Sequence, residues 1–222
     1  MATRPRGICR YCGEEVVKQS IGKHLDKCAK RQAAIAEAVG TSEMLVRLRA
    51  ECAWDKRFFL DLEVRGSAKL SDLDKYLRAI WLECCGHLSE FCYDPWVDTI
   101  PSTRKVETVF KNRKTAMHLY DMGTTSETLL TEISTRQGVS TTKNPIVLLI
   151  RNKIPEVECD DCKKPASWLC KECLYEEGEP SYLCDSCIGP HGHTENYGPP
   201  ILLVNSPRLG MCGYDGPAEP PY

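Results

Sequence analysis

The stretch "FFLDLEVRGSAKLSDLDKYLRAIWLECCG", residues 58–86, decides the fold of the middle of the chain. Every second residue from Phe58 to Val64 is apolar, which predicts a strand with one buried face. After Ser71 the apolar residues recur at helical spacing, and Gly86 follows as a C-terminal stop, so this part predicts an amphipathic helix. The apolar stripe of the helix consists of Leu73, Leu77, Ile80, Trp81 and Cys84.

Three further stretches have the composition of strands, around residues 87–93, 126–135 and 144–152. The last opens with Asn-Pro and is apolar enough for one buried strand. A strand, a helix and then several strands predict an α+β fold with a central mixed sheet and a helix packed across one face.

Charge and cysteine content divide the chain of 222 residues into three segments. Residues 1–40 carry a net charge of +4, residues 41–156 carry +1, and residues 157–222 carry −7. The start of the sequence has no apolar run typical of a secretory signal, and no stretch approaches membrane-spanning length, so we expect a cytoplasmic protein. In a reducing compartment the Cys-x-x-Cys pairs among the 14 cysteines are better explained as metal ligands than as disulfides.

The first segment, residues 1–40, combines a metal motif with a helix-forming stretch. Its motif has the spacing C-x2-C-x11-H-x3-C, and zinc requires four such ligands in a tetrahedron. This spacing resembles the zinc-finger superfamily over about residues 7–31, as a Cys-Cys-His-Cys variant of the ββα finger. The expected ligands are Cys9, Cys12, His24 and Cys28.

The basic residues of this finger raise a second possibility, contact with nucleic acid. One finger reads only about three base pairs, so it would not bind tightly and specifically by itself. The alternative is that the basic side chains only solvate a small domain. The candidate contacts are Lys18, Lys23, Lys27, Lys30 and Arg31.

The third segment, residues 157–222, holds eight potential ligands spaced C-x2-C-x7-C-x2-C-x10-C-x2-C-x3-H-x-H. Three Cys-x-x-Cys pairs followed by two histidines are what an interleaved site for two zinc ions requires, so three zinc ions are predicted for the whole chain. The closing histidines favour zinc over an iron–sulfur cluster. A loose C-terminal tail follows. The ligands are Cys159, Cys162, Cys170, Cys173, Cys184, Cys187, His191 and His193.

This segment resembles the B-box, a cross-braced zinc module related to RING fingers. The resemblance implies that Cys159, Cys162, Cys184 and Cys187 hold one ion, and it implies protein–protein interaction. The other ion is then held by Cys170, Cys173, His191 and His193, with Cys212 as an alternative to one histidine. A small ββα finger and a cross-braced two-zinc module would thus flank the α+β core of residues 41–156.

The core, over about residues 55–151, resembles the plasmid open-reading-frame-three-like family, named from a root-inducing plasmid. The resemblance implies the fold more than an activity, and some members accompany mobile elements. The matching residues are Leu70, Leu73, Trp81, His87, Leu88, Glu90, Phe91, Tyr120, Asp121 and Gly123.

We therefore expect a non-catalytic zinc protein that acts as an interaction module or adaptor for another macromolecule, with a protein partner. A nucleic-acid-binding accessory protein linked to mobile elements is the alternative. A thiol-dependent enzyme using Cys84, Cys85 and His87 is the second alternative, although Cys84 falls on the apolar stripe. The sequence contains no phosphate-binding glycine loop and indicates no small-molecule substrate.

Overall fold

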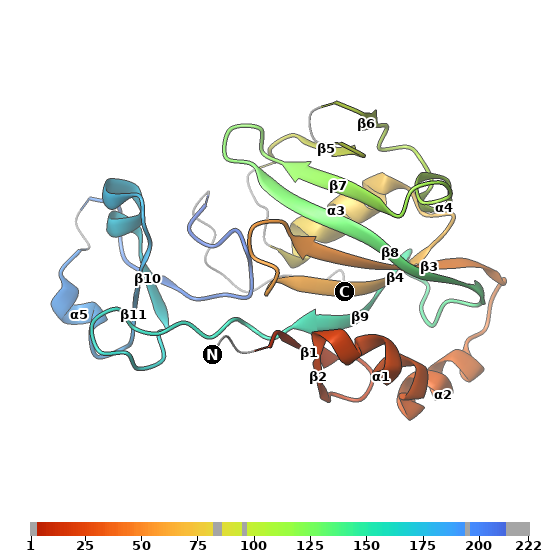
Figure 1. The fold of residues 1–222 in the computed structure, drawn as a ribbon, viewed down its shortest axis with the longest axis horizontal. Coiled ribbons are helices and arrows are strands. Elements are labelled where there is room, and N and C mark those ends of the chain that lie inside the picture. The colour runs from red at the N-terminus through yellow and green to blue at the C-terminus, as the bar shows by residue number, and fades with distance from the viewer. Residues whose placement is uncertain (1–3, 82–85, 95–96, 194–195, 212–222) are drawn as a thin grey trace.

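The computed structural model describes residues 4–81, 86–94, 97–193 and 196–211. A sheet of nine strands forms the body of the molecule, in the order β2-β1-β9-β4-β3-β8-β7-β5-β6 (Figure 1). The α+β class is confirmed, but every pair of neighbouring strands is antiparallel, so the prediction of a mixed sheet is wrong. The strands are β1 (Arg6–Cys9), β2 (Glu15–Val17), β3 (Glu43–Cys52), β4 (Phe59–Arg65), β5 (Ser89–Cys92), β6 (Thr99–Ile100), β7 (Thr115–Tyr120), β8 (Ser126–Gly138) and β9 (Ile146–Asn152).

Strand β4 lies in the middle of the sheet and is buried on both faces, not on one as the alternation of its residues predicts. Leu60, Leu62 and Val64 face the main core, while Asp61 and Glu63 are 0% and 4% exposed on the other side. Each of these carboxylates is satisfied by two arginines, which removes the cost of burying an unpaired charge. Asp61 binds Arg47 and Arg49, and Glu63 binds Arg31 and Arg136.

Helix α3 (Leu70–Ile80) covers one face of the sheet and confirms the predicted packed helix. Its buried residues include Leu73 and Leu77, and Trp81 continues the same core at 0% exposure. The helix begins at Leu70 because the Asp72 carboxylate accepts the backbone N–H of Lys69 at 2.9 Å. It ends at Ile80, so the predicted stop at Gly86 is wrong, and the predicted stripe residue Cys84 lies outside the described residues. The short helix α4 (Val106–Val109) adds to the same core.

Asp74 on α3 forms a network with charged and polar groups of the sheet. Its Oδ1 lies 2.8 Å from Nε2 of His118, a fully buried side chain that packs against the ring of Phe91. Arg78, one turn along, donates to Asp74 at 2.9 Å and to Ser89 at 2.7 Å. Burial alone would raise the pKa of Asp74, but hydrogen bonds from His118, Ser89 and Arg78 outweigh it and lower the pKa to about 2.

This lowered pKa predicts an acid-dependent loss of stability. A carboxyl with a folded pKa of about 2 and an unfolded pKa of about 3.9 stabilises the fold by about 2 kcal/mol at neutral pH. Its contribution is complete above the unfolded pKa and is lost as the pH falls towards 2. The difference in unfolding free energy between wild type and Asp74→Asn should therefore shrink by about 2 kcal/mol between pH 6 and 2 in urea titrations. Metal release by acid affects both proteins, and an equal difference at every pH would contradict the prediction.

The N-terminal finger is built into the sheet. Strand β1 pairs with β9 from Gly7 opposite Asn152 to Cys9 opposite Ile150. A Cβ at Gly7 would lie 2.5 Å from Ile150 Cγ2, so this close approach requires glycine. Helices α1 (Ile21–Lys27) and α2 (Ala29–Glu37) follow the 3₁₀ turn Lys18–Ser20, and a second core forms between α1 and the sheet. This core contains Cys9, Val16, Ile21, Leu25, Cys28, Phe59, Val147, Leu149 and Ile150.

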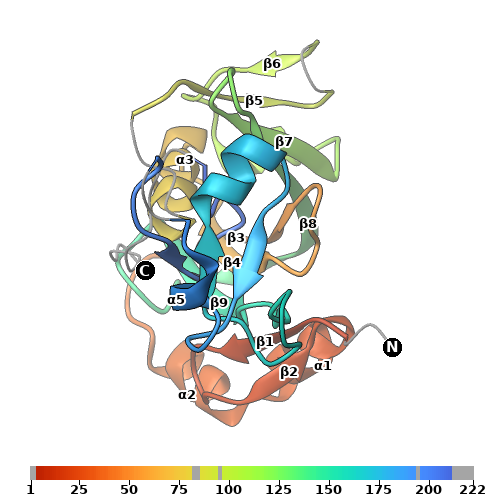
Figure 2. The same ribbon diagram turned by 90° about the vertical axis from the view of Figure 1, so that its left-hand side faces the viewer.

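The C-terminal two-zinc module lies beside one end of the sheet (Figure 1), and Figure 2 views the molecule from that side. It consists of the sheet β11-β10-β12, a π-helical turn and the short helix α5. No helix among the described residues is long and apolar enough to cross a membrane. The elements are β10 (Trp168–Cys170), the π-helix η2 (Cys173–Glu177), β11 (Ser181–Leu183), α5 (Ile188–His191) and β12 (Ile201–Leu202).

The chain that leaves this module returns to the main sheet and binds there. Asn152, at the end of β9, and Asn205, just after β12, exchange two hydrogen bonds of 2.7 Å. Ser206 donates to the carbonyl of Trp81 at 2.5 Å, and Arg208 is 2% exposed. We call residues 205–208 the latch. It joins the exit of the module to its entry and fixes both to the core.

Candidate metal centres

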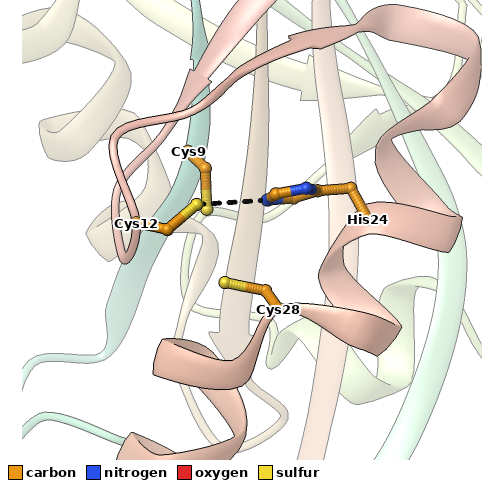
Figure 3. Close-up of side chains that lie close together, drawn as sticks. All are labelled: Cys9, Cys12, His24 and Cys28. Carbon is orange, nitrogen blue, oxygen red and sulfur yellow. Dashed lines mark hydrogen bonds between the residues drawn. The ribbon is translucent and has the colours of Figure 1, made fainter.

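The first cluster lies between the β1–β2 hairpin and the two finger helices (Figure 3). Cys9 ends β1 and Cys12 lies in the turn that follows, while His24 is on α1 and Cys28 caps the start of α2. The four ligand atoms lie within 4.8 Å of one another, and Cys12 Sγ is 3.5 Å from His24 Nε2. Nδ1 of His24 lies 3.4 Å from a carboxylate oxygen of Glu14, the outer-shell partner that orients many metal-bound histidines.

The second and third clusters interleave along the C-terminal module. Cys159, Cys162, Cys184 and Cys187 come together in one cluster, and Cys162 Sγ lies 3.6 Å from Cys184 Sγ. The pairing that the B-box resemblance implies therefore agrees with the structure. The alternative ligand Cys212 lies outside the described residues. The other cluster consists of Cys170, Cys173, His191 and His193.

The distances within the third cluster test whether its donors suit zinc. Cys173 Sγ lies 3.3 Å from His191 Nε2 and 3.4 Å from His193 Nδ1, and Cys170 Sγ lies 3.8 Å from His193 Nδ1. A tetrahedral zinc ion with bonds of about 2.0–2.3 Å places its ligand atoms about 3.3–3.8 Å apart. The first cluster offers three sulfurs and one nitrogen, the second offers four sulfurs, and the third offers two sulfurs and two nitrogens. All three donor sets are typical of zinc. Each of the three clusters is thus able to hold one zinc ion.

Four protein donors complete a tetrahedral zinc shell, so the chemistry that these ions supply is structural. None of the eleven cysteines in the described residues forms a disulfide. Burial raises the pKa of the Cys9 thiol to about 11 in the metal-free chain. At Cys159, burial also raises the pKa, but backbone N–H groups, including those of Cys162 and Cys184, outweigh it and lower the pKa to about 6. Zinc binding at the first site must therefore displace protons.

The five basic residues predicted to contact nucleic acid separate into two groups. Lys23, Lys27 and Lys30 are exposed beside a hollow of about 670 Å³ that Cys12 and His24 also line. The side chains of the other two, Lys18 and Arg31, already have partners within the protein. Arg31 is 8% exposed and donates to Glu63 at 3.2 Å, and Lys18 binds Glu51 and the carbonyl of Lys56.

The thiols proposed for an enzymatic role, Cys84 and Cys85, lie outside the described residues, so that hypothesis stays a prediction. Nδ1 of His87 lies 3.4 Å from Oδ2 of Asp121. Asp121 adopts φ 64° and accepts the backbone N–H of Gly123 at 3.0 Å, which agrees with a role in turn geometry. This N–H is the largest of the influences that lower the pKa of Asp121 to about 2.

Sequence reasoning missed Arg208, which completes the site around Asp121. Its guanidinium donates to Asp121 Oδ2 and Ser126 Oγ at 2.5 Å and to the Thr124 carbonyl at 2.9 Å. It also lies over the ring of Tyr120, 4.8 Å from the ring centroid. The only signal in the sequence is an arginine between a proline and a leucine, which does not distinguish a buried side chain from an exposed one.

Comparison with known proteins leaves the family open. No protein-family model matches the chain, and no curated protein matches it. Among solved structures, the crystal structure of a protein of unknown function, MM3350 from Methanosarcina mazei Go1, is similar at 16% identity and a TM-score of 0.41. The similarity covers 50% of this chain and 68% of that one. The resemblance to the plasmid family stays a prediction.

Proposed function

We propose that this chain is a zinc-scaffolded binding protein that recognises another protein and catalyses no reaction. The observation that carries the proposal is that each of the three clusters supplies four protein ligands, which leaves no coordination position for a substrate. The zinc ions would then serve to hold the protein surface in shape. In the C-terminal module the residues around the two ions form turns and short strands with few large buried side chains of their own, so metal binding supplies much of the order of its surfaces. A cytoplasmic location would suit sites made of reduced thiols.

Affinity capture on the immobilised full chain tests this proposal. Zinc-loaded protein should retain a specific partner protein from an extract of its own cells, and protein stripped with a chelator should lose it. Nuclease treatment should leave the capture unchanged. Capture that survives removal of all three ions would contradict the proposal, as would capture that disappears with nuclease.

Nucleic-acid binding is the second candidate, and one observation favours it. Lys23, Lys27 and Lys30 form no ion pair among the described residues and follow one another along α1 and the start of α2. Three unpaired cations on one surface are what contact with phosphates requires. The candidate is weaker than the five-residue prediction, because Lys18 and Arg31 are already occupied.

Replacing Lys23, Lys27 and Lys30 together by alanine should distinguish the two candidates. If this surface binds duplex DNA, the slope of log K against log salt concentration should become shallower by up to about 2.7, because each phosphate contact contributes about 0.9. A fluorescence anisotropy titration at several salt concentrations measures the slope. The exposed lysines Lys75, Lys111 and Lys143 provide a triple alanine control of equal charge. Equal slopes for the two triple variants would eliminate this surface as a nucleic-acid site.

A further inference from the structure

Two exposed tyrosines of the C-terminal module lie against each other. Tyr175 is 49% exposed and Tyr197 is 38% exposed, and their ring centroids are 5.2 Å apart with an angle of 33° between the planes. Large aromatic side chains are enriched at protein interfaces because each buries much area at a small cost in conformational entropy. A pair of them left partly open to solvent therefore needs an explanation.

The third metal cluster brings these two rings together across 22 positions of sequence. Tyr175 lies in the π-helical turn that starts at the ligand Cys173, and Tyr197 follows the ligand His193 by four residues. The Tyr175 hydroxyl donates to the carbonyl of Gly210 at 2.8 Å, and the Tyr197 hydroxyl donates to Glu176 Oε1 at 3.2 Å. Single π-helical turns are rare and occur frequently at functional sites. The pair is thus held in place by a metal site and by hydrogen bonds at both hydroxyls.

The surroundings of the pair are strongly acidic. Carboxylates at Glu172, Glu176, Glu177 and Glu179 follow one another through the turn, and the whole segment of residues 157–222 has a net charge of −7. The negative charge of Glu176 is the largest influence that raises the pKa of Tyr197. Glu172 accepts from Asn196 through Oε1 at 3.2 Å, while its buried Oε2 has no hydrogen-bond partner among the described residues.

Nucleic-acid bases and cationic side chains are two ligands that stack on tyrosine rings. The bases bring phosphates, which the four carboxylates would repel, whereas a guanidinium or ammonium group is attracted by both the rings and the carboxylates. We propose that Tyr175 and Tyr197, with Glu176 and Glu177, form a docking surface for a basic, arginine-rich peptide segment of a partner protein. This inference rests on the proposed function and names the chemistry of the partner.

The test uses the zinc-loaded full chain and a fluorescent nonapeptide of alternating arginine and glycine. The peptide should bind, and its analogue with citrulline in place of arginine, which keeps the shape but not the charge, should bind at least about tenfold more weakly. Replacing both tyrosines by alanine should weaken binding at least about tenfold, because interface aromatics commonly carry such effects. Replacing both by phenylalanine keeps the rings and should change the affinity less than about threefold.

Two further pairs of variants show whether the location matters. Glu176→Gln with Glu177→Gln removes charge beside the rings and should weaken binding at least about fivefold. Glu156→Gln with Glu158→Gln removes equal charge from exposed positions at the entry of the module and should change binding less than about twofold. Native mass spectrometry should find three zinc ions in every variant. If the double alanine variant of the tyrosines loses zinc, the comparison of the two double glutamine variants decides whether the surface binds the peptide.

Absence of peptide binding, equal loss in the two glutamine pairs, or tighter binding of single-stranded RNA than of the arginine peptide would each overturn the docking surface. These outcomes are separable from failure of the proposed function. If the alanine pair still captures the partner protein in a chelator-sensitive manner, the adaptor role stands and this surface is not its contact. If capture is insensitive to chelation, the proposed function itself fails.

Discussion

Cys28→Ser should remove one of three zinc ions and destabilise the entire nine-stranded sheet by several kcal/mol. A structural zinc site supplies an apparent binding free energy of about 10–16 kcal/mol, which is comparable with the total stability of a domain. Cys28 is also the N-cap of α2, and serine is a preferred N-cap residue. The substitution therefore keeps the cap and removes the ligand, so the loss reports on the metal.

The effect should reach the sheet because the finger is part of it. Strand β1 pairs with β9, and α1 of the finger packs in one core with Phe59, Val147 and Leu149, which lie on β4 and β9. When the finger unfolds, these side chains become exposed to water and β9 becomes an edge of the sheet. Hydrogen exchange should therefore accelerate in β9 and β4 as well as in residues 6–37, and urea unfolding should shift as a whole.

Cys52→Ala provides the control. Cys52 is 1% exposed, lies in β3 and belongs to none of the three clusters, and burial raises its pKa to about 11, so it is an inert thiol. Its truncation should cost about 1 kcal/mol and leave three zinc ions in native mass spectra. If Cys28→Ser loses its ion but β4 and β9 exchange at the wild-type rate, the finger is independent of the sheet.

The metal centres could be predicted from sequence because their ligands are set by local spacing. A Cys-x-x-Cys pair places two sulfurs on one turn, and His24 and Cys28 are one helical turn apart, so each half of a site is encoded within a few residues. The resemblance to the B-box, and not the spacing, implies which of these half-sites share an ion. Only the half-sites themselves can be recognised without knowing how distant segments pack.

The features that escaped prediction depend on contacts between distant segments. The pairing of β1 with β9 uses backbone hydrogen bonds, which nearly any residue can form, so no side chain in the sequence indicates it. Asp61 and Glu63 are buried because the finger covers the second face of the sheet. The alternation of apolar and polar residues in β4 therefore predicts one buried face where the structure has two. Arg31 resembles its exposed lysine neighbours in sequence and differs only because Glu63 lies beneath it.

Arg208→Ala should have the second largest effect, a loss of about 3–5 kcal/mol, because it breaks a buried ion pair from one side. The side chain of Arg208 is 1% exposed and that of its partner Asp121 is 11% exposed. Removing the guanidinium takes the buried arginine away from the Asp121 carboxylate and deprives Ser126 and the Thr124 carbonyl of a donor. The free energy of unfolding from urea titrations measures the loss.

The variant should also loosen the attachment of the C-terminal module while leaving its metal in place. Arg208 ends the latch, which begins at Asn205 only three residues after β12. With the arginine gone, amide exchange should rise across residues 203–209 and at the linker of residues 153–158. Native mass spectra should still show three zinc ions, since no ligand has changed.

Arg113→Ala is a closely matched control, because Arg113 makes the same kinds of contact at the surface. Its guanidinium lies 3.2 Å from Asp94 and 4.6 Å from the ring centroid of Tyr93, but the side chain is 50% exposed. Solvent screening limits such a pair to about 0.2–1 kcal/mol. A loss at Arg208 no larger than the loss at Arg113 would mean that the latch does not hold the module. A large loss at Arg208 alone, with all three ions retained, would show that burial makes one arginine of the tail a structural link between the zinc module and the core.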